Sequence, residues 1–134
     1  QTRLQVLFCN IQMIFNIFSV ISTLRTALLA TGLTIYRDVK PESQTGACMV
    51  LTYMPRKKTN CVSINDVIIL LYLPKINGTT GRDLETYSLQ IMDIVKNIQI
   101  QGGVINYNES VEPETSNLDS NYTVTKFQFY TINY

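Results

Sequence analysis

The chain lacks histidine and tryptophan altogether. Without histidine it has neither the usual general base near neutral pH nor the commonest metal ligand. Its three cysteines, Cys9, Cys48 and Cys61, are too scattered along the sequence for a zinc ribbon. No Ser-x-x-Lys arrangement occurs, and no nucleophile has a histidine partner. The sequence therefore predicts a non-catalytic protein with no cofactor and no metal.

Charge is also scarce, since charged residues make up 16% of the 134 residues, against roughly 25% in an ordinary soluble domain. The formal net charge of +1 provides no overall field that would attract nucleic acid, so we expect no nucleic-acid partner. Arg56, Lys57 and Lys58 form the one basic cluster in the sequence. We interpret it as a solvated hairpin tip that discourages edge aggregation, with anionic lipid or phosphate binding as the alternative.

A long uncharged run stands near the beginning of the chain. From Leu4 to Leu24 there is no charged side chain, and Arg3 and Arg25 flank the run. As a helix, this run would be about 32 Å long, close to the thickness of the hydrocarbon core of a bilayer. The helical pattern continues to about Val39. A helix that is apolar around most of its circumference is buried by lipid or by other helices.

The same run predicts how the protein would assemble. A narrow polar stripe of amides and hydroxyls would meet partner helices, because such groups are costly in hydrocarbon unless they are paired. The apolar residues expected to form the assembly helix are Leu7, Phe8, Ile11, Phe15, Phe18 and Ile21.

The rest of the chain is polar and rich in strand-forming residues. Runs over 48–54, 62–73 and 122–134 predict strands, and the spacing of apolar residues over 84–98 predicts an amphipathic helix. The acidic stretch 108–121 has the composition of a loop. The expected fold is α+β, with a long N-terminal hydrophobic helix over residues 1–40 and a small β-rich extracellular head over residues 41–134.

Two kinds of modification are suggested by sequence patterns. A Cys48–Cys61 disulfide and two separate buried thiols are both compatible with the spacing, and either leaves Cys9 within the hydrophobic run. Asn77, Asn108 and Asn121 each begin an N-x-[ST] glycosylation pattern. Glycosylation at these asparagines would place the head outside the cell.

In its layout the chain resembles a type IV pilin-like protein, bacterial or archaeal. The matching features are the hydrophobic run over 4–36 and the Thr-, Asn- and Tyr-rich remainder. The resemblance implies an N-terminal helix that packs with its copies into a filament core, while a β-rich head is displayed outside.

Two functions of different class follow from these observations. The first is a structural subunit of a cell-surface filament, whose partners are copies of itself through the N-terminal helix. The second is a single-pass membrane glycoprotein, in contact with membrane lipid, whose extracellular head binds a protein partner. Both place the protein at the cell surface or outside the cell.

Overall fold

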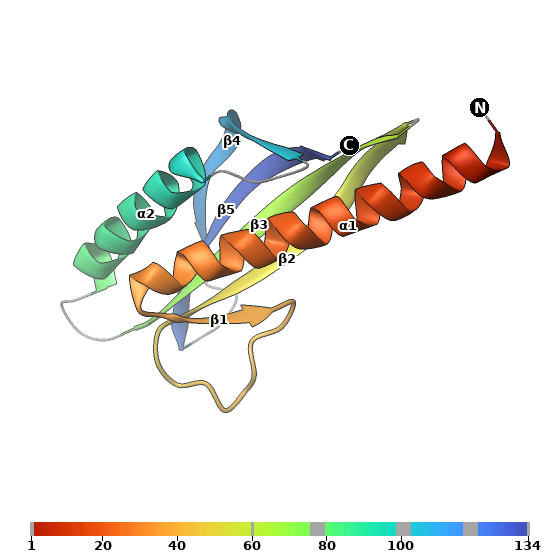
Figure 1. Ribbon diagram of the computed structural model, residues 1–134. Helices are drawn as coiled ribbons and strands as arrows, with labels where there is room; N and C mark the ends of the chain where they lie inside the picture. Colours follow the sequence, from red (N-terminus) through yellow and green to blue (C-terminus); the bar gives the residue numbers. More distant parts are fainter. Residues whose placement is uncertain (1, 60, 76–79, 99–102, 117–120, 134) are drawn as a thin grey trace.

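The computed structural model describes residues 2–59, 61–75, 80–98, 103–116 and 121–133, without the side chains of residues 10, 12–15, 80–82 and 103–116. Over these residues the chain forms helices and strands in a mixed order (Figure 1). The elements are α1 (Arg3–Leu28), the 3-10 turn η1 (Leu29–Thr31), β1 (Thr34–Arg37), β2 (Cys48–Thr59), β3 (Val62–Pro74), α2 (Thr80–Asn97), β4 (Gly103–Ser116) and β5 (Tyr122–Asn133).

The strands form one five-stranded sheet in the order β1-β2-β3-β5-β4. β1 pairs with β2 in parallel, and the other neighbouring strands pair antiparallel. The long strand β3 lies at the centre, paired with β2 on one side and β5 on the other. Both helices lie over the sheet, and α1 runs along β2 and β3 in the view of Figure 1.

The core lies between the helices and one face of the sheet. Along β3, Val67, Ile69 and Leu71 are fully buried, whereas the residues between them are only partly buried. This alternation follows from the two-residue period of a strand, which sends successive side chains to opposite faces. The buried face meets both helices through one cluster, which includes Ile21 of α1 and Ile91 of α2.

The expected long N-terminal helix with a separate head is wrong, although the α+β mixture is present and the β-sheet dominates the core. α1 ends at Leu28 instead of continuing to about Val39. Gly32 follows η1 with φ of +80°, a left-handed conformation that glycine adopts readily and that ends a helix. The chain then enters β1, which pairs with β2, so the expected boundary at residue 40 falls between two strands of one sheet.

The expected helix over 84–98 and the expected strand over 62–73 are confirmed by α2 and β3, and the expected strand over 122–134 is confirmed by β5 as far as Asn133, the last described residue. Two other expectations are wrong. β2 continues through the basic cluster to Thr59, so Arg56, Lys57 and Lys58 lie on a strand and not in a turn. β4 extends to Ser116 and takes up much of the stretch 108–121 that was expected to be a loop.

Candidate interaction surface

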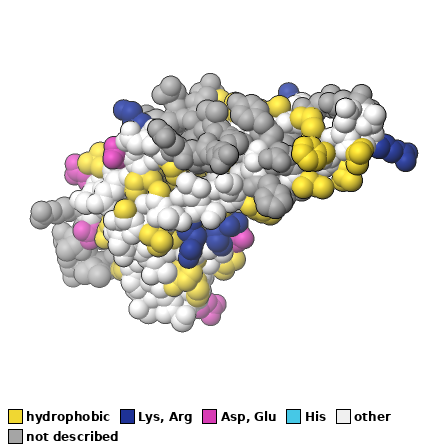
Figure 2. Space-filling view, in the orientation of Figure 1, with side chains coloured by type: hydrophobic (Ala, Val, Ile, Leu, Met, Phe, Trp, Pro, Cys, Tyr) yellow, Lys and Arg dark blue, Asp and Glu magenta, His cyan; other side chains and the backbone are white. Residues whose placement is uncertain are grey.

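The N-terminal half of α1 exposes large apolar side chains to solvent. Leu4 is 76% exposed and Phe8 is 67% exposed, values far above those of core residues. Five exposed apolar residues share one face of the helix by their spacing, and we call them the apolar stripe; they are Leu4, Leu7, Phe8 and Ile11 in this half and Phe18 just beyond it. Figure 2 shows hydrophobic side chains gathered at the end of the molecule that carries the N-terminus of α1. Contiguous exposed apolar surface on a folded protein marks an interaction site.

The C-terminal half of α1 behaves differently, because it forms part of the protein's own core. Val20, Ile21, Leu24 and Leu28 are fully buried. α1 therefore passes from an exposed helix to a core helix within one unbroken element.

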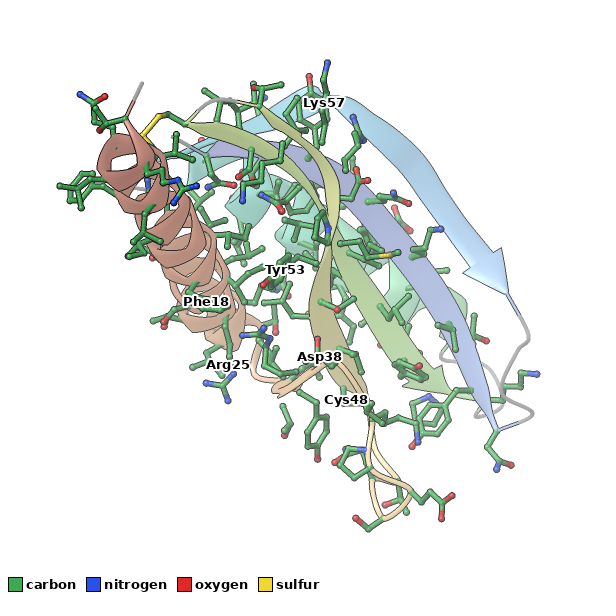
Figure 3. All side chains as sticks on the ribbon, turned by 90° about the vertical axis from the view of Figure 1, so that its right-hand side faces the viewer. Phe18, Arg25, Asp38, Cys48, Tyr53 and Lys57 are labelled. Atoms are coloured by element: carbon green, nitrogen blue, oxygen red, sulfur yellow. A yellow bond between two sulfur atoms is a disulfide. The ribbon has the colours of Figure 1, made fainter. Side chains whose placement is uncertain are left out.

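The change of environment occurs at Phe18. Its ring meets that of Tyr53 on β2 edge to face, with centroids 6.4 Å apart, yet half of the Phe18 side chain remains exposed. Further along the helix, Nε of Arg25 donates a hydrogen bond to the carbonyl oxygen of Ile35 at 3.4 Å. Arg25 therefore joins the end of α1 to β1. Figure 3 labels both Phe18 and Arg25 along α1.

The spacing of the apolar stripe suits packing against another helix. Leu4, Ile11 and Phe18 are seven residues apart, and Leu7 follows Leu4 by three. Apolar residues spaced in this way form the seam along which two helices pack. Because no charged side chain occurs between Arg3 and Arg25, a second helix can cover this seam without burying a charge.

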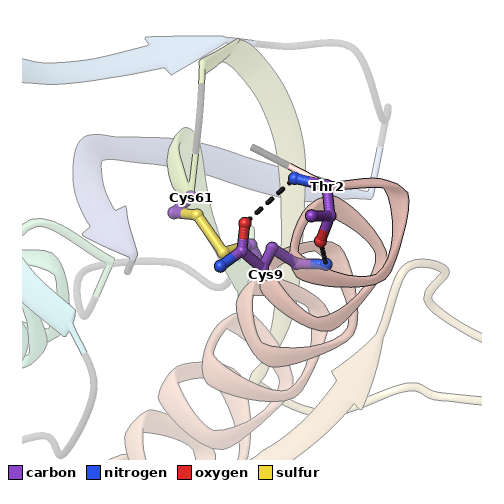
Figure 4. The surroundings of a disulfide bond; sticks show 4 residues. Thr2, Cys9 and Cys61 are labelled. Atoms are coloured by element: carbon purple, nitrogen blue, oxygen red, sulfur yellow. Dashed lines mark hydrogen bonds between the residues drawn. A yellow bond between two sulfur atoms is a disulfide. The ribbon is translucent and has the colours of Figure 1, made fainter.

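A disulfide between Cys9 and Cys61 joins α1 to the turn between β2 and β3 (Figure 4). The Cα atoms of the two cysteines are 4.8 Å apart, although 52 residues separate them in the sequence. Neither alternative left open by the sequence, a Cys48–Cys61 bridge or two separate thiols at these positions, is right, because Cys61 pairs with Cys9 of the hydrophobic run and Cys48 is a buried free thiol. Sequence spacing gave no signal for this pairing, since it depends on where α1 lies over the sheet.

The structure divides the six residues of the expected assembly helix. Leu7, Phe8, Ile11 and Phe18 are exposed and belong to the apolar stripe. Ile21 is fully buried in the protein's own core, so its assignment to an assembly contact is wrong. The side chain of Phe15 lies outside the described residues.

The basic cluster is partly engaged within the protein. Arg56 forms an ion pair with Asp66 of β3 and lies over the ring of Tyr130, 4.8 Å from its centroid. Lys57 and Lys58 are exposed on the last residues of β2, next to the turn that holds Cys61, and Figure 3 shows Lys57 at the same end of the sheet as the disulfide. The cations therefore lie near the exposed half of α1, so copies of the protein would repel one another if these ends met.

A shallow cleft of about 460 Å³ lies at the other end of the sheet, lined by Lys40, Glu42, Gln44, Thr45, Asn121 and Tyr122. Nζ of Lys40 lies 4.8 Å from the centroid of the Tyr122 ring, and the Tyr122 hydroxyl donates to the carbonyl oxygen of Gln44 at 2.7 Å. These contacts attach the segment after β1 to the start of β5. Because these contacts hold two segments of the same chain together, we interpret the cleft as part of the fold and not as a binding site.

The three candidate glycosylation residues have different surroundings. Asn121 is exposed in a turn directly before β5. Asn108 lies on β4, and its side chain is outside the description. Asn77 lies outside the described residues.

Within the described part of the chain, no group of three or more histidine, cysteine, aspartate or glutamate residues is arranged to hold a metal ion. Nor does any helix there combine the length and the apolar character required to cross a membrane.

No protein-family model matches the chain, and no curated protein matches it either. Among the solved structures that are similar, one whose name describes no function aligns with a TM-score of 0.53 at 12% sequence identity. The alignment covers 87% of this chain and 91% of that one. Likeness at such low identity concerns the fold alone, and the resemblance to a pilin-like protein stays a prediction.

Proposed function

We propose that this protein is a non-catalytic structural subunit that associates with copies of itself through the apolar stripe of α1. The observation that carries the proposal is the exposure of Leu4, Leu7 and Phe8 on a helix that contributes Ile21, Leu24 and Leu28 to the core further along. Leaving several large apolar side chains in water forgoes about 1.5–3 kcal/mol for each. A second α1 would cover them with a surface of the same chemistry.

The charges favour an antiparallel arrangement of the two helices. In a parallel pair, Arg3 of both copies would lie together, beside the exposed Lys57 and Lys58 of each. In an antiparallel pair, the start of one α1 lies near Phe18 of the other, and the cations are separated. Such a contact is two-fold symmetric, which is the commonest form of association between identical chains.

A cell-surface filament is the extended form of this proposal. A two-fold contact alone closes to a dimer, so a filament needs either a staggered, repeating contact between helices or a second surface. The disulfide supports an extracellular location, because such bonds persist in oxidising compartments.

The experiment compares two leucine variants, Leu7→Asp on the apolar stripe and Leu89→Asp on α2. Leu89 is the matched control because it is also an exposed helical leucine, at 61% against 56% for Leu7. Sedimentation velocity over a range of protein concentrations gives the association constant. We expect Leu7→Asp to weaken association at least about 100-fold, equivalent to about 2.8 kcal/mol, and Leu89→Asp to leave it unchanged.

Negative-stain imaging of the unmodified protein then separates a closed dimer from a filament. A wild-type chain that remains a monomer at all concentrations would refute the proposal. Equal effects of the two leucine variants would refute the assignment of the contact to α1.

A further inference from the structure

We infer that the Cys9–Cys61 disulfide holds the N-terminal half of α1 in place, so that self-association requires the oxidised protein. This inference rests on the proposed function, because it concerns the regulation of the same surface. The bond keeps the start of α1 beside the sheet. The apolar stripe then forms a fixed surface that another copy of the chain can bind.

The side chains that the structure describes at the start of α1 make little noncovalent packing with the rest of the protein. Every described side chain from Thr2 to Phe8 is exposed, and Ile11 is half exposed. The buried residues of α1 begin at Asn16 and Ile17 among the side chains that the structure describes. Segments with few buried contacts open most readily in a folded protein.

The sequence of the first turn gives mixed support to the helix. Thr2 and Gln5 form a capping box, in which the Thr2 hydroxyl accepts from the Gln5 amide at 3.2 Å and the Gln5 side chain accepts from the Thr2 amide at 2.9 Å. Against this, Arg3 lies in the first turn and no acidic residue does, which is unfavourable next to the positive end of the helix dipole. A helical segment of about 12–15 residues is marginal in water without tertiary contacts.

The disulfide supplies the missing attachment at a well-anchored place. Cys61 lies in the turn between β2 and β3 with φ of +58°, and pairing between the strands continues to Thr59 and Val62 at the base of that turn. The β2–β3 pair is part of the central sheet. Cys9 is therefore bonded to a residue that directly adjoins the paired ends of β2 and β3. It lies about two helical turns beyond Arg3.

Reduction of the Cys9–Cys61 bond would release the start of α1 from the β2–β3 turn and leave the core packing unchanged. A dithiol reductant supplies two electrons, the Cys9–Cys61 bond breaks, both sulfurs take up a proton, and the reductant becomes its cyclic disulfide. Cys48 is buried at the opposite end of the sheet (Figure 3), so it does not lie near the two released thiols. The freed half of α1 then frays while residues 17–28 remain packed.

The test compares the full chain in oxidised form, the same chain treated with dithiothreitol, and the Cys9→Ser variant. Peptide mass mapping first establishes which cysteines are bonded. Hydrogen exchange then follows the amides of residues 4–12 and, as an internal reference, those of β3. Sedimentation velocity gives the dimer constant for each form, with Cys48→Ala as a variant that keeps the disulfide.

We expect reduction and Cys9→Ser each to speed exchange over residues 4–12 about tenfold while β3 keeps its protection. If the helix is then formed in about a tenth of the molecules, each copy loses about tenfold in affinity and the dimer constant weakens about 100-fold. Reduction of Cys9→Ser should cause no further change. Cys48→Ala should respond to dithiothreitol as the wild type does.

Three outcomes would overturn the inference. Association that is equal in the oxidised and fully reduced chains would refute it and leave the proposed function intact. Mass mapping that finds no Cys9–Cys61 bond would do the same. An oxidised chain that never associates would refute the proposed function and this inference together.

Discussion

Phe18 of α1 and Tyr53 of β2 meet edge to face, with 6.4 Å between ring centroids and an interplanar angle of 75°. Phe18 is the last member of the apolar stripe, and it remains 51% exposed while it touches the sheet. The pair therefore attaches α1 to β2 near the point where the helix passes from exposed residues to core residues. A substitution of Phe18 therefore removes a contact with β2 and also changes the end of the apolar stripe.

The first prediction concerns the energy of this aromatic pair. In a double-mutant cycle with Phe18→Leu and Tyr53→Leu, we expect a coupling energy of about 0.5–1.5 kcal/mol, because edge-to-face aromatic contacts contribute this much beyond area burial. Urea unfolding of the four proteins at low concentration, where association is negligible, measures it. Strict additivity of the two substitutions would show that the rings do not interact.

The second prediction uses two leucines on one helix to test the division of α1. Leu24→Ala should destabilise the fold by about 2–5 kcal/mol, the usual cost of truncating a fully buried leucine. Leu4→Ala should change stability by no more than about 0.5 kcal/mol, because Leu4 is exposed. Denaturant unfolding at low protein concentration gives both values. Equal costs at the two positions would contradict a helix that is half core and half surface.

Periodicity and composition revealed β2, β3, β5 and α2 in the sequence. They did not reveal β1, most of β4, or where α1 is buried. Along 62–73 the apolar run is short and ends at Pro74, which is typical of a central strand. Residues 4–24 are apolar around most of the helix, so no face is marked as the one that meets the sheet. Which part of α1 is buried depends on how far the sheet extends beneath the helix. That depends on the tertiary structure and leaves no pattern in the sequence of the helix.

The end of α1 had a local signal that the apolar pattern concealed. Gly32 stands where the helix stops, but the apolar residues that continue to Val39 resemble a longer helix. In the folded chain, Ile35 is buried through a strand that pairs with β2. The disulfide was hidden for a similar reason, because Cys9 and Cys61 approach only once α1 lies beside the β2–β3 turn.

The third prediction concerns a buried polar cluster in the sheet. Oδ1 of Asn133 accepts hydrogen bonds from Nδ2 of Asn65 at 3.0 Å and from the Thr131 hydroxyl at 2.7 Å. Thr131→Val keeps the shape of the side chain and removes one donor, so we expect a loss of about 1–2 kcal/mol in unfolding free energy.

The matched control for this cluster is Thr26→Val on α1, where the hydroxyl donates to the carbonyl oxygen of Ser22 at an exposed site. Water replaces that bond, so we expect a change within about 0.5 kcal/mol. Thermal or denaturant unfolding of both variants makes the comparison. A cost at Thr26 as large as that at Thr131 would mean that burial is not what makes the Thr131 bond matter.

The fourth prediction is a dependence of stability on pH that originates at Cys48. Burial raises the pKa of the Cys48 thiol, outweighing the opposing effect of the charge on Lys40. In the unfolded chain the thiol ionises near its ordinary pKa of about 8.5, whereas the folded protein retains the proton to higher pH. The contribution of Cys48 to stability is therefore complete below about pH 8 and declines as the pH rises from the unfolded toward the folded pKa.

Subtracting the unfolding free energy of Cys48→Ala from that of the wild type isolates this effect from other groups that titrate at alkaline pH. We expect the difference to be constant between pH 6 and about pH 8 and then to fall, with a slope no steeper than about 1.4 kcal/mol per pH unit. Guanidinium unfolding at half-unit steps up to about pH 10 measures it, with mass mapping at each pH to verify that Cys9 and Cys61 remain bonded. A flat difference across the whole range would mean that the thiol ionises equally readily in both states, and would contradict a Cys48 pKa raised by burial.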